Sequence, residues 1–229
     1  MPRPIRGQIS ARHRGDLAFP SRLPTVRCVD ETGVMPLPYE ELSNPPRTIF
    51  LVSVGAFLAG ELVQAFRSRP GAARVDVRAE IVFRVLFFAA ILLLPLGRAV
   101  APTAVIGGGV FVFGLGVLLG WLGLLLRWWS FVSLGRYFTV VVETSEDQPV
   151  VTRGPYRVLR HPSYTGLLLA FAGAGLMVGD WLSAVGTVVL VLIALTHRLR
   201  IEENALTAAL GDRYRDFAAS RARLIPYVW

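Results

Sequence analysis

Residues 103–126 form an apolar stretch without a single charged side chain. A spanning helix needs about 20 mostly apolar residues, so a run of this length is typical of a helix that crosses a bilayer. We read the three consecutive glycines at 107–109 inside it as a packing site or a kink. The whole chain is 53% hydrophobic and only 17% charged, whereas soluble domains have about a quarter of their residues charged. The sequence therefore predicts an integral membrane protein and argues against a soluble enzyme.

Four further stretches have the composition of membrane spans: residues 48–66, 81–96, 165–178 and 181–196. The last two are separated only by Gly179 and Asp180, which predicts a tight hairpin, because one continuous helix would be too long for the bilayer. The predicted fold class is all-α, a membrane bundle of about five transmembrane helices. Gly116 with Gly120, and Gly175 with Gly179, have the GxxxG spacing that lets backbones approach closely, although glycine is also common in membrane helices.

The first 47 residues contrast with this pattern. They hold seven arginines and eight prolines, with no sustained hydrophobic period. This composition is typical of a flexible or surface-lying extension, and no apolar run is long enough for a cleavable signal peptide. We therefore divide the chain into an extension, residues 1–47, and a membrane domain, residues 48–229.

The charge distribution predicts the orientation. All 24 basic residues are arginine, against 16 acidic residues, and the net charge is +8. Nucleic-acid binding is one interpretation of such a balance, but in a chain this apolar, topology and anionic headgroups explain it better. With five spans, fifteen arginines fall on the side of the C-terminus and eight on the other. The positive-inside rule then predicts a cytoplasmic C-terminus, although seven of the eight opposing arginines lie in the extension.

The polar part of the domain begins with a loop at residues 127–164, on the predicted cytoplasmic side. It ends in the block GPYRVLRHPSYTG at residues 154–166, where two prolines and two glycines keep the backbone out of a regular helix. Arginine and tyrosine also serve as interfacial anchors. Anchoring does not require His161 between Arg160 and Pro162, so the block favours a function.

A second polar cluster follows the fifth predicted span. Arg198 and Glu202 are four residues apart and share a helix face, either as a functional pair or as an ion pair that ends the helix. Beyond them a helical repeat of apolar residues predicts an amphipathic helix lying on the membrane or on the bundle. That repeat consists of Leu206, Leu210, Tyr214 and Phe217. The closing residues 224–227 can fold back over the site.

Metal and nucleotide motifs are absent from the sequence. The histidines His13, His161 and His197 have no ligand spacing, and Cys28 is the single cysteine. There is no GxGxxG, Walker or GxSxG motif. We expect no metal, and any cofactor is held by something other than a Rossmann-type fold.

The two polar blocks together resemble the isoprenylcysteine carboxyl methyltransferase family and its phospholipid methyltransferase relatives. The matching pieces are LGR at 134–136, GPYRxxRHPSYTG at 154–166, RxxxEExxL at 198–206, GxxY at 211–214 and LIP at 224–226. The resemblance implies a membrane enzyme that uses S-adenosylmethionine in a pocket closed by the C-terminal segment. Its lipophilic substrate would enter from the membrane side.

The resemblance also implies roles for individual residues. Five side chains would form the cofactor pocket: Tyr156, His161, Pro162, Tyr164 and Glu203. Arg198 and Glu202 correspond to the family's catalytic pair beside the transferred methyl group. An arginine suits a carboxylate acceptor because its fork can bind both oxygens. The in-line displacement depends on alignment and desolvation, and Glu202 could stabilise or position the sulfonium.

The sequence departs from the eukaryotic pattern, in which a longer acidic run follows the arginine, because Asn204 follows Glu203 here. The arginine-only composition, rich in Ala, Gly and Val, suggests a high-GC bacterium, in which prenylated proteins are not expected. We therefore expect a methyltransferase of the bacterial inner membrane that acts on another small or lipophilic carboxylate, amine or thiol.

Two alternatives stay open. Membrane sterol-type reductases share the RHPxY block but bind NADPH, usually have Asn where Ser163 stands, and lack the paired Glu202 and Glu203. A non-enzymatic lipid-binding bundle would need the charged cluster only to end a helix. Whether the protein binds S-adenosylhomocysteine or NADPH separates the two enzymes.

Overall fold

A computed structural model describes residues 44–65, 73–74, 77–135, 143–144 and 150–225. Residues 1–43, with Cys28 and His13, and residues 226–229 lie outside the described residues. The helices are α1 (Asn44–Ala65), α2 (Val77–Val100), α3 (Gly109–Leu134), the 3-10 helix η2 (Gly154–Arg157), α4 (Pro162–Val178), α5 (Trp181–Leu210) and α6 (Asp212–Ala219). Two two-residue strands, β1 (Ala73–Arg74) and β2 (Glu143–Thr144), pair antiparallel.

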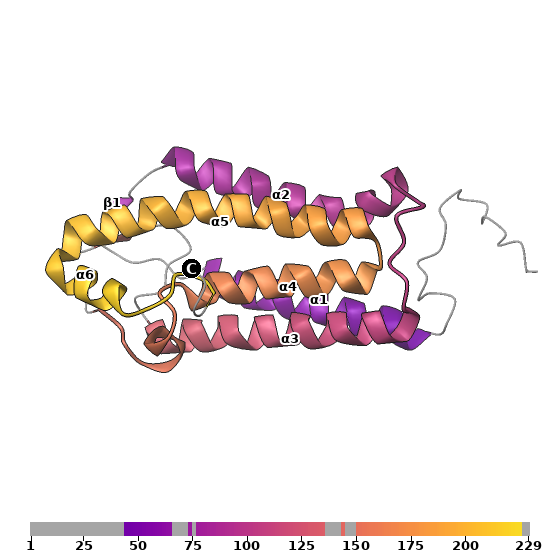
Figure 1. The fold of residues 1–229 in the computed structure, drawn as a ribbon, viewed down its shortest axis with the longest axis horizontal. Helices are drawn as coiled ribbons and strands as arrows, with labels where there is room; N and C mark the ends of the chain where they lie inside the picture. The colour runs from indigo at the N-terminus through magenta and orange to yellow at the C-terminus, as the bar shows by residue number, and fades with distance from the viewer. Residues whose placement is uncertain (1–43, 66–72, 75–76, 136–142, 145–149, 226–229) are drawn as a thin grey trace, which may run out of the picture.

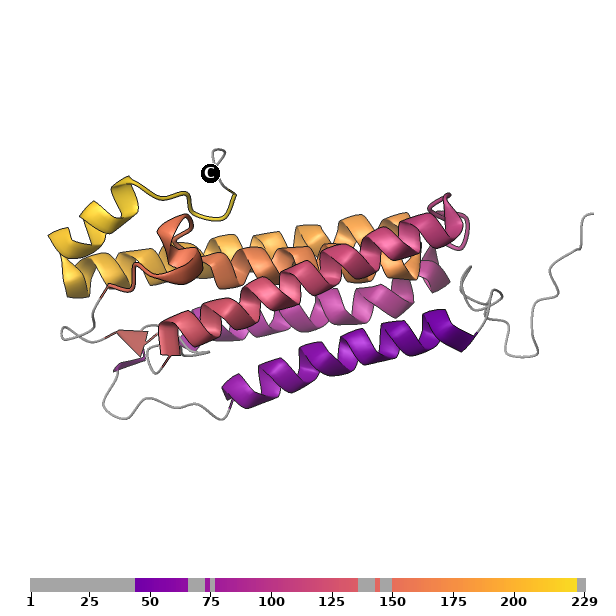
Figure 2. The same ribbon diagram turned by 90° about the horizontal axis from the view of Figure 1, so that it is seen from below.

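The five long helices α1–α5 lie side by side along the length of the molecule, and α6 turns back at one end (Figures 1 and 2). Helix α4 is inserted between α3 and α5, and α2 packs on α5. Four helices, α1, α2, α3 and α5, are long and apolar enough to cross a membrane, and α4 is a shorter apolar helix of 17 residues. The expectation of a helical membrane bundle is confirmed, and each of the five predicted stretches overlaps one of these helices.

The hairpin predicted at Gly179 and Asp180 is present. Gly179 ends α4 with a φ of +74°, a left-handed conformation that glycine adopts without steric cost. Asp180 begins α5 by accepting a hydrogen bond from the backbone N–H of Ser183 at 2.7 Å. The chain therefore reverses within two residues, and the alternative of one continuous helix is excluded.

Three predicted boundaries are wrong: the start of α3, the end of α3 and the end of α5. Helix α3 begins at Gly109, so the glycines at 107–109 precede or open the helix instead of kinking it. The same helix continues to Leu134, which places Arg127 inside it instead of on a loop. Helix α5 continues past residue 196 to Leu210, so the charged cluster lies within the helix and does not end it.

Gly211, with a φ of +57°, separates α5 from α6. The predicted amphipathic helix is therefore divided, with Leu206 and Leu210 on α5 and with Tyr214 and Phe217 on α6. The four side chains still pack into one apolar cluster. The kink changes the path of the chain but keeps the predicted apolar face.

Glycines let α3 and α4 approach closely. A Cβ atom on Gly116 would lie 2.8 Å from the carbonyl oxygen of Gly173, and a Cβ on Gly173 would collide with the backbone of Gly120. Gly175 faces Ala184 of α5 in the same way. Close packing at the predicted GxxxG residues Gly116, Gly120 and Gly175 is therefore confirmed.

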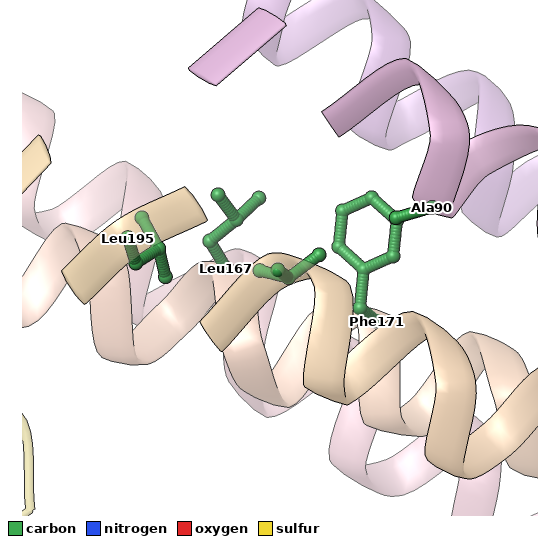
Figure 3. Packing of buried hydrophobic residues seen from close by; sticks show 5 residues of the cluster. Ala90, Leu167, Phe171 and Leu195 are labelled. Carbon is green, nitrogen blue, oxygen red and sulfur yellow. The ribbon is translucent and has the colours of Figure 1, made fainter. Parts of the chain in front are cut away.

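The apolar core joins α2, α4 and α5 (Figure 3). Leu167 and Phe171 of α4 lie between Ala90 of α2 and Leu195 of α5, and all four are buried. This packing fixes the start of α4 against the second half of α5, where the polar blocks of the sequence meet.

Candidate active site

The segment after α6 returns to the start of α4. The backbone N–H groups of Arg160 and His161 donate to the carbonyls of Ala222 and Arg223, at 2.8 and 3.2 Å. The Thr165 hydroxyl donates to the carbonyl of Leu224 at 2.6 Å. The expected return of the closing residues is confirmed up to residue 225, whereas residues 226–227 lie outside the described residues.

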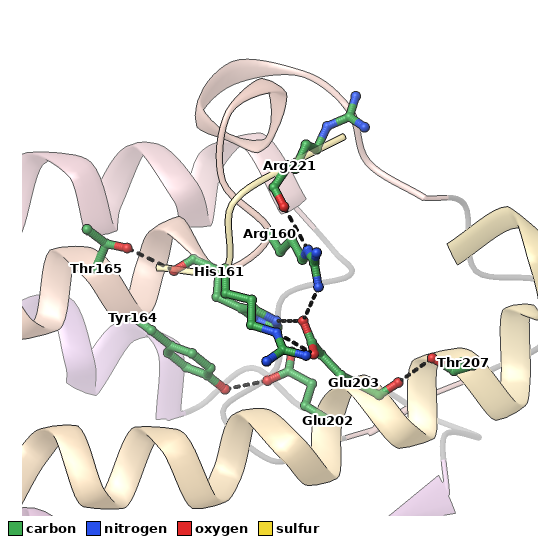
Figure 4. A network of polar contacts seen from close by, with 9 residues as sticks. Arg160, His161, Tyr164, Thr165, Glu202, Glu203, Thr207 and Arg221 are labelled. Atoms are coloured by element: carbon green, nitrogen blue, oxygen red, sulfur yellow. Dashed lines mark hydrogen bonds and ion pairs between the residues drawn. The ribbon is translucent and has the colours of Figure 1, made fainter. Parts of the chain in front are cut away.

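Glu203 is the centre of one polar cluster (Figure 4). Its carboxylate pairs with Arg160 at 3.1 Å and with Arg223 at 3.1 Å, and it lies 3.4 Å from Nε2 of His161. The three partners come from the block before α4 and from the returning segment. Glu203 therefore ties three parts of the chain together, and hydrogen bonding to charged groups offsets the cost of burying its carboxylate.

Tyr164 is the centre of a second cluster. Its hydroxyl donates to Oε2 of Glu202 at 2.5 Å and accepts from Nε of Arg198 at 2.9 Å. The two residues of the predicted catalytic pair are thus joined through a hydroxyl group from another helix. These two hydrogen bonds fix the carboxylate of Glu202 and the guanidinium of Arg198 relative to each other in a mostly buried position.

Glu80 of α2, which the sequence analysis missed, lies at the far side of Arg198. Its Oε2 accepts from Nη1 of Arg198 at 2.7 Å, and its Oε1 accepts from Nε of Arg84 at 2.8 Å. The guanidinium of Arg198 also lies over the ring of Phe83, 4.6 Å from its centroid. An acidic residue at the start of an apolar span requires a partner, and that signal could have found Glu80.

A further ion pair, between Arg127 and Glu61, lies next to the site. The guanidinium of Arg127 on α3 binds both carboxylate oxygens of Glu61 on α1, at 2.5 and 2.8 Å. Its Nη1 donates to the hydroxyl of Ser163 at 2.8 Å. This arrangement ties α1 and α3 to the first turn of α4, one residue before Tyr164.

The remaining predicted pocket residues are buried nearby. Pro162 is the first residue of α4, and the backbone carbonyl of Tyr156 accepts from Nε of Arg221 at 3.0 Å. Burial raises the pKa of Tyr156 above its usual range, and the carboxylate of Glu202 raises it further. Tyr156 is therefore a neutral hydrogen-bonding group at physiological pH.

Tyr214 on α6 is a further candidate. Its hydroxyl is buried and has no hydrogen-bond partner within the described part of the chain. Burial, then the charges of Glu203 and Glu202, raise the pKa of this hydroxyl. A buried donor without a partner is costly, so Tyr214 is suited to bind a ligand beside the two glutamates. Among the residues that the structure describes, no group of three His, Cys, Asp or Glu side chains could hold a metal ion.

Comparison with known proteins gives a consistent result. Residues 116–208 match the model of the isoprenylcysteine carboxyl methyltransferase (ICMT) family. Protein-S-isoprenylcysteine O-methyltransferase A of Arabidopsis thaliana is 35% identical over 99 residues, which cover 42% of this chain and 50% of that protein. Methanethiol S-methyltransferase of Mycobacterium tuberculosis is 40% identical over 73 residues, which cover 31% of this chain and 28% of that protein. The chain thus spans half the length, or less, of these two relatives.

A solved structure of the eukaryotic intramembrane Ras methyltransferase ICMT has the same fold. It aligns with a TM-score of 0.55 and 21% identity, covering 83% of this chain and 68% of that chain. The resemblance inferred from the motifs is therefore confirmed. The matched family region includes Arg127, Tyr164, Arg198 and Glu202, whereas Glu80 and Tyr214 lie outside it.

Proposed function

We propose that this protein is an integral membrane methyltransferase that uses S-adenosylmethionine. The observation that carries the proposal is a contact made by Tyr164, the last residue of the RHPSY block. Its hydroxyl joins Arg198 to Glu202. The names of the relatives support the same class of reaction, because they are O- and S-methyltransferases. We propose Arg198 and Glu202 as the catalytic residues and Tyr156, His161, Pro162, Tyr164 and Glu203 as the cofactor pocket.

The residues present fit this cofactor. S-adenosylmethionine supplies a methyl group activated by a positively charged sulfonium, so its pocket needs negative charge without strong bases. Glu202 and Glu203 provide that charge next to each other on α5. The buried Tyr214 hydroxyl, which lacks a protein partner among the described residues, provides a hydrogen bond for a polar group of the cofactor.

The chain's own side chains would perform three tasks. Tyr164 fixes the carboxylate of Glu202, and Glu203 holds the returning segment over the site through Arg223. Burial by this segment excludes water, which strengthens electrostatic interactions within the site. The acceptor is oriented against Arg198 and Glu202, because a displacement requires an in-line approach.

We infer the location from charge and composition. With α1–α5 all crossing the membrane, the site lies on the side that carries fifteen arginines, which the positive-inside rule makes cytoplasmic. The arginine-only composition supports a bacterial inner membrane. The methyl acceptor is a lipophilic or small molecule that reaches the site from the bilayer or the cytoplasm.

Calorimetry on the detergent-purified full chain tests the proposal. S-adenosylhomocysteine should bind with micromolar affinity, and NADPH should not bind. Asp212→Asn on the exposed surface of α6 is the control and should bind S-adenosylhomocysteine normally. Binding of NADPH instead would support the reductase alternative. Binding of neither ligand would favour the non-enzymatic lipid-binding bundle over both enzymes.

A further inference from the structure

The positive charge of Arg198 is already bound by the protein itself. Its Nη1 donates to Glu80 at 2.7 Å, its Nε donates to Tyr164 at 2.9 Å, and one face of the guanidinium lies over Phe83. An arginine that grips a carboxylate uses two of its N–H groups in a fork. Two of the nitrogens of Arg198 already bind side chains of this chain, one of them an anion.

With Arg198 paired, the group that can contact an acceptor is the carboxylate of Glu202, an anion. Oε2 of Glu202 accepts from Tyr164, and the structure gives its other oxygen, Oε1, no hydrogen bond within the described residues. Glu202 is half-buried, and at low dielectric like charges repel strongly. A carboxylate acceptor would therefore meet the negative charges of Glu202 and Glu80, while Arg198, the described cation between them, is already paired. A neutral acceptor that carries a labile hydrogen atom would instead find a base.

We propose that the acceptor is a thiol, that Glu202 receives its proton, and that Glu80 sets this preference by pairing with Arg198. The inference rests on the proposed methyl transfer. The acceptor's S–H bond breaks and its proton goes to Oε1 of Glu202, while a sulfur lone pair forms the new bond to the methyl carbon. The methyl–sulfur bond of the sulfonium donor breaks, and its electron pair stays on the donor sulfur. Glu202 then releases the proton to water.

A thiol fits this site better than the other acceptors with a labile proton. An alkylamine, with a pKa of about 10.4, enters as an ammonium ion without a lone pair. A thiol is neutral near pH 7 and keeps its lone pairs, because even the cysteine thiol has a pKa of about 8.5 and simple alkanethiols are weaker acids. A neutral thiol also costs less to desolvate beside the ring of Phe83 than a charged group. The thiol is therefore the acceptor that needs one weak base and no cation.

The first experiment compares acceptors of matched chain length, 1-octanethiol and octanoate, on the full chain in detergent. The wild-type protein should methylate the thiol with a kcat/KM at least roughly tenfold higher than the carboxylate. Glu80→Gln leaves Arg198 without its anion and should raise the octanoate-to-octanethiol ratio by roughly tenfold. Asp212→Asn should leave the ratio unchanged. An octanoate preference in the wild type, or an unchanged ratio in Glu80→Gln, overturns the inference.

The second experiment tests Glu202 as the base. Thiophenol is largely ionised near neutral pH and needs no base, whereas 1-octanethiol does. Glu202→Gln should therefore lose transfer to 1-octanethiol by at least roughly tenfold more than transfer to thiophenol. Equal losses for both thiols would make Glu202 a structural residue and overturn the inference.

Binding separates this inference from the proposed function. Calorimetry on protein saturated with S-adenosylhomocysteine should detect 1-octanethiol and not octanoate. If S-adenosylhomocysteine binds and octanoate is the bound and methylated acceptor, the proposed function stands and only the thiol inference is wrong. If S-adenosylhomocysteine does not bind, both are wrong.

Discussion

The imidazole of His161 lies parallel to the ring of Tyr164, with centroids 5.4 Å apart and planes inclined by only 6°. Each ring reaches a different member of one pair of neighbouring carboxylates. His161 contacts Glu203, and Tyr164 contacts Glu202. The stack therefore keeps two adjacent glutamates in separate surroundings, and the residues on either side of it can be tested independently.

His161→Ala should weaken the binding of S-adenosylhomocysteine while the helices stay intact. The change removes one partner of Glu203 and one ring of the stack. A lost hydrogen bond to a charged group costs about 1.5–3 kcal/mol, so the dissociation constant should rise at least roughly tenfold. Calorimetry measures the affinity and circular dichroism verifies the helices. Unchanged affinity in a folded variant would mean that the block at residues 154–166 serves only as a membrane anchor.

Tyr164→Phe keeps the stacked ring but removes the hydroxyl between Arg198 and Glu202. We expect weaker binding of S-adenosylhomocysteine and a larger loss in methyl transfer, because the relative position of the catalytic pair is no longer fixed. Isothermal titration and single-turnover transfer measure the two effects separately. A phenylalanine variant with wild-type values in both would remove Tyr164 from the site.

Arg198→Lys should lower methyl transfer by at least about tenfold, or about 1.4 kcal/mol of transition-state stabilisation. Lysine keeps the charge but cannot hold Glu80 and Tyr164 at once with the planar fork of arginine. Binding of S-adenosylhomocysteine should change little. A variant that instead loses this affinity would move Arg198 to the cofactor side of the pocket.

Gly173→Ala should destabilise the bundle. The added Cβ would collide with the backbone of Gly120 on α3, and overpacking of this kind costs about 1–3 kcal/mol. Gly114→Ala is the matched control, because no atom lies within 4 Å of its Cβ position, and alanine favours a helix. Thermal unfolding in detergent should give a lower midpoint only for the first variant. Equal midpoints would mean that α3 and α4 are farther apart.

Arg127→Met should destabilise the protein more than the double variant Arg127→Met with Glu61→Leu. Removing one partner of a buried ion pair leaves an uncompensated charge at a cost of about 3–5 kcal/mol, whereas replacing both partners by apolar side chains is often neutral. Thermal midpoints of the two variants and of the wild type provide the comparison. If the double variant is the less stable one, the Arg127–Glu61 pair contributes more than charge compensation.

The sequence predicted the helices well but placed the ends of α3 and α5 too early, and both errors have one cause. A predicted apolar span ends at a charged residue, because local hydropathy carries no information about a partner on another helix. Arg127 continues α3 because Glu61 of α1 binds it, and Arg198 continues α5 because Glu80 of α2 binds it. Both glutamates are distant in sequence from their arginines, so no local spacing indicated the pairing.

The arrangement of the candidate site was predicted in part. The two motif blocks lie together, as the resemblance carried by the linked motifs implied. Tyr164 contacts both Arg198 and Glu202. Glu80 and the buried Tyr214 hydroxyl were missed. The first had only a weak local signal at the start of an apolar span. The second was predicted as part of an apolar helix face, and only the turn at Gly211 directs it toward the glutamates.

The return of residues 220–225 to the start of α4 sets an order of assembly. These residues leave the ribosome after all of the helices α1–α6, yet Arg223 supplies a partner of Glu203 and Leu224 accepts from Thr165. A nascent chain with every long helix already inserted therefore still lacks one wall of its pocket. The protein can therefore enclose a ligand only after residues 220–225 have followed helices α1–α6 out of the ribosome.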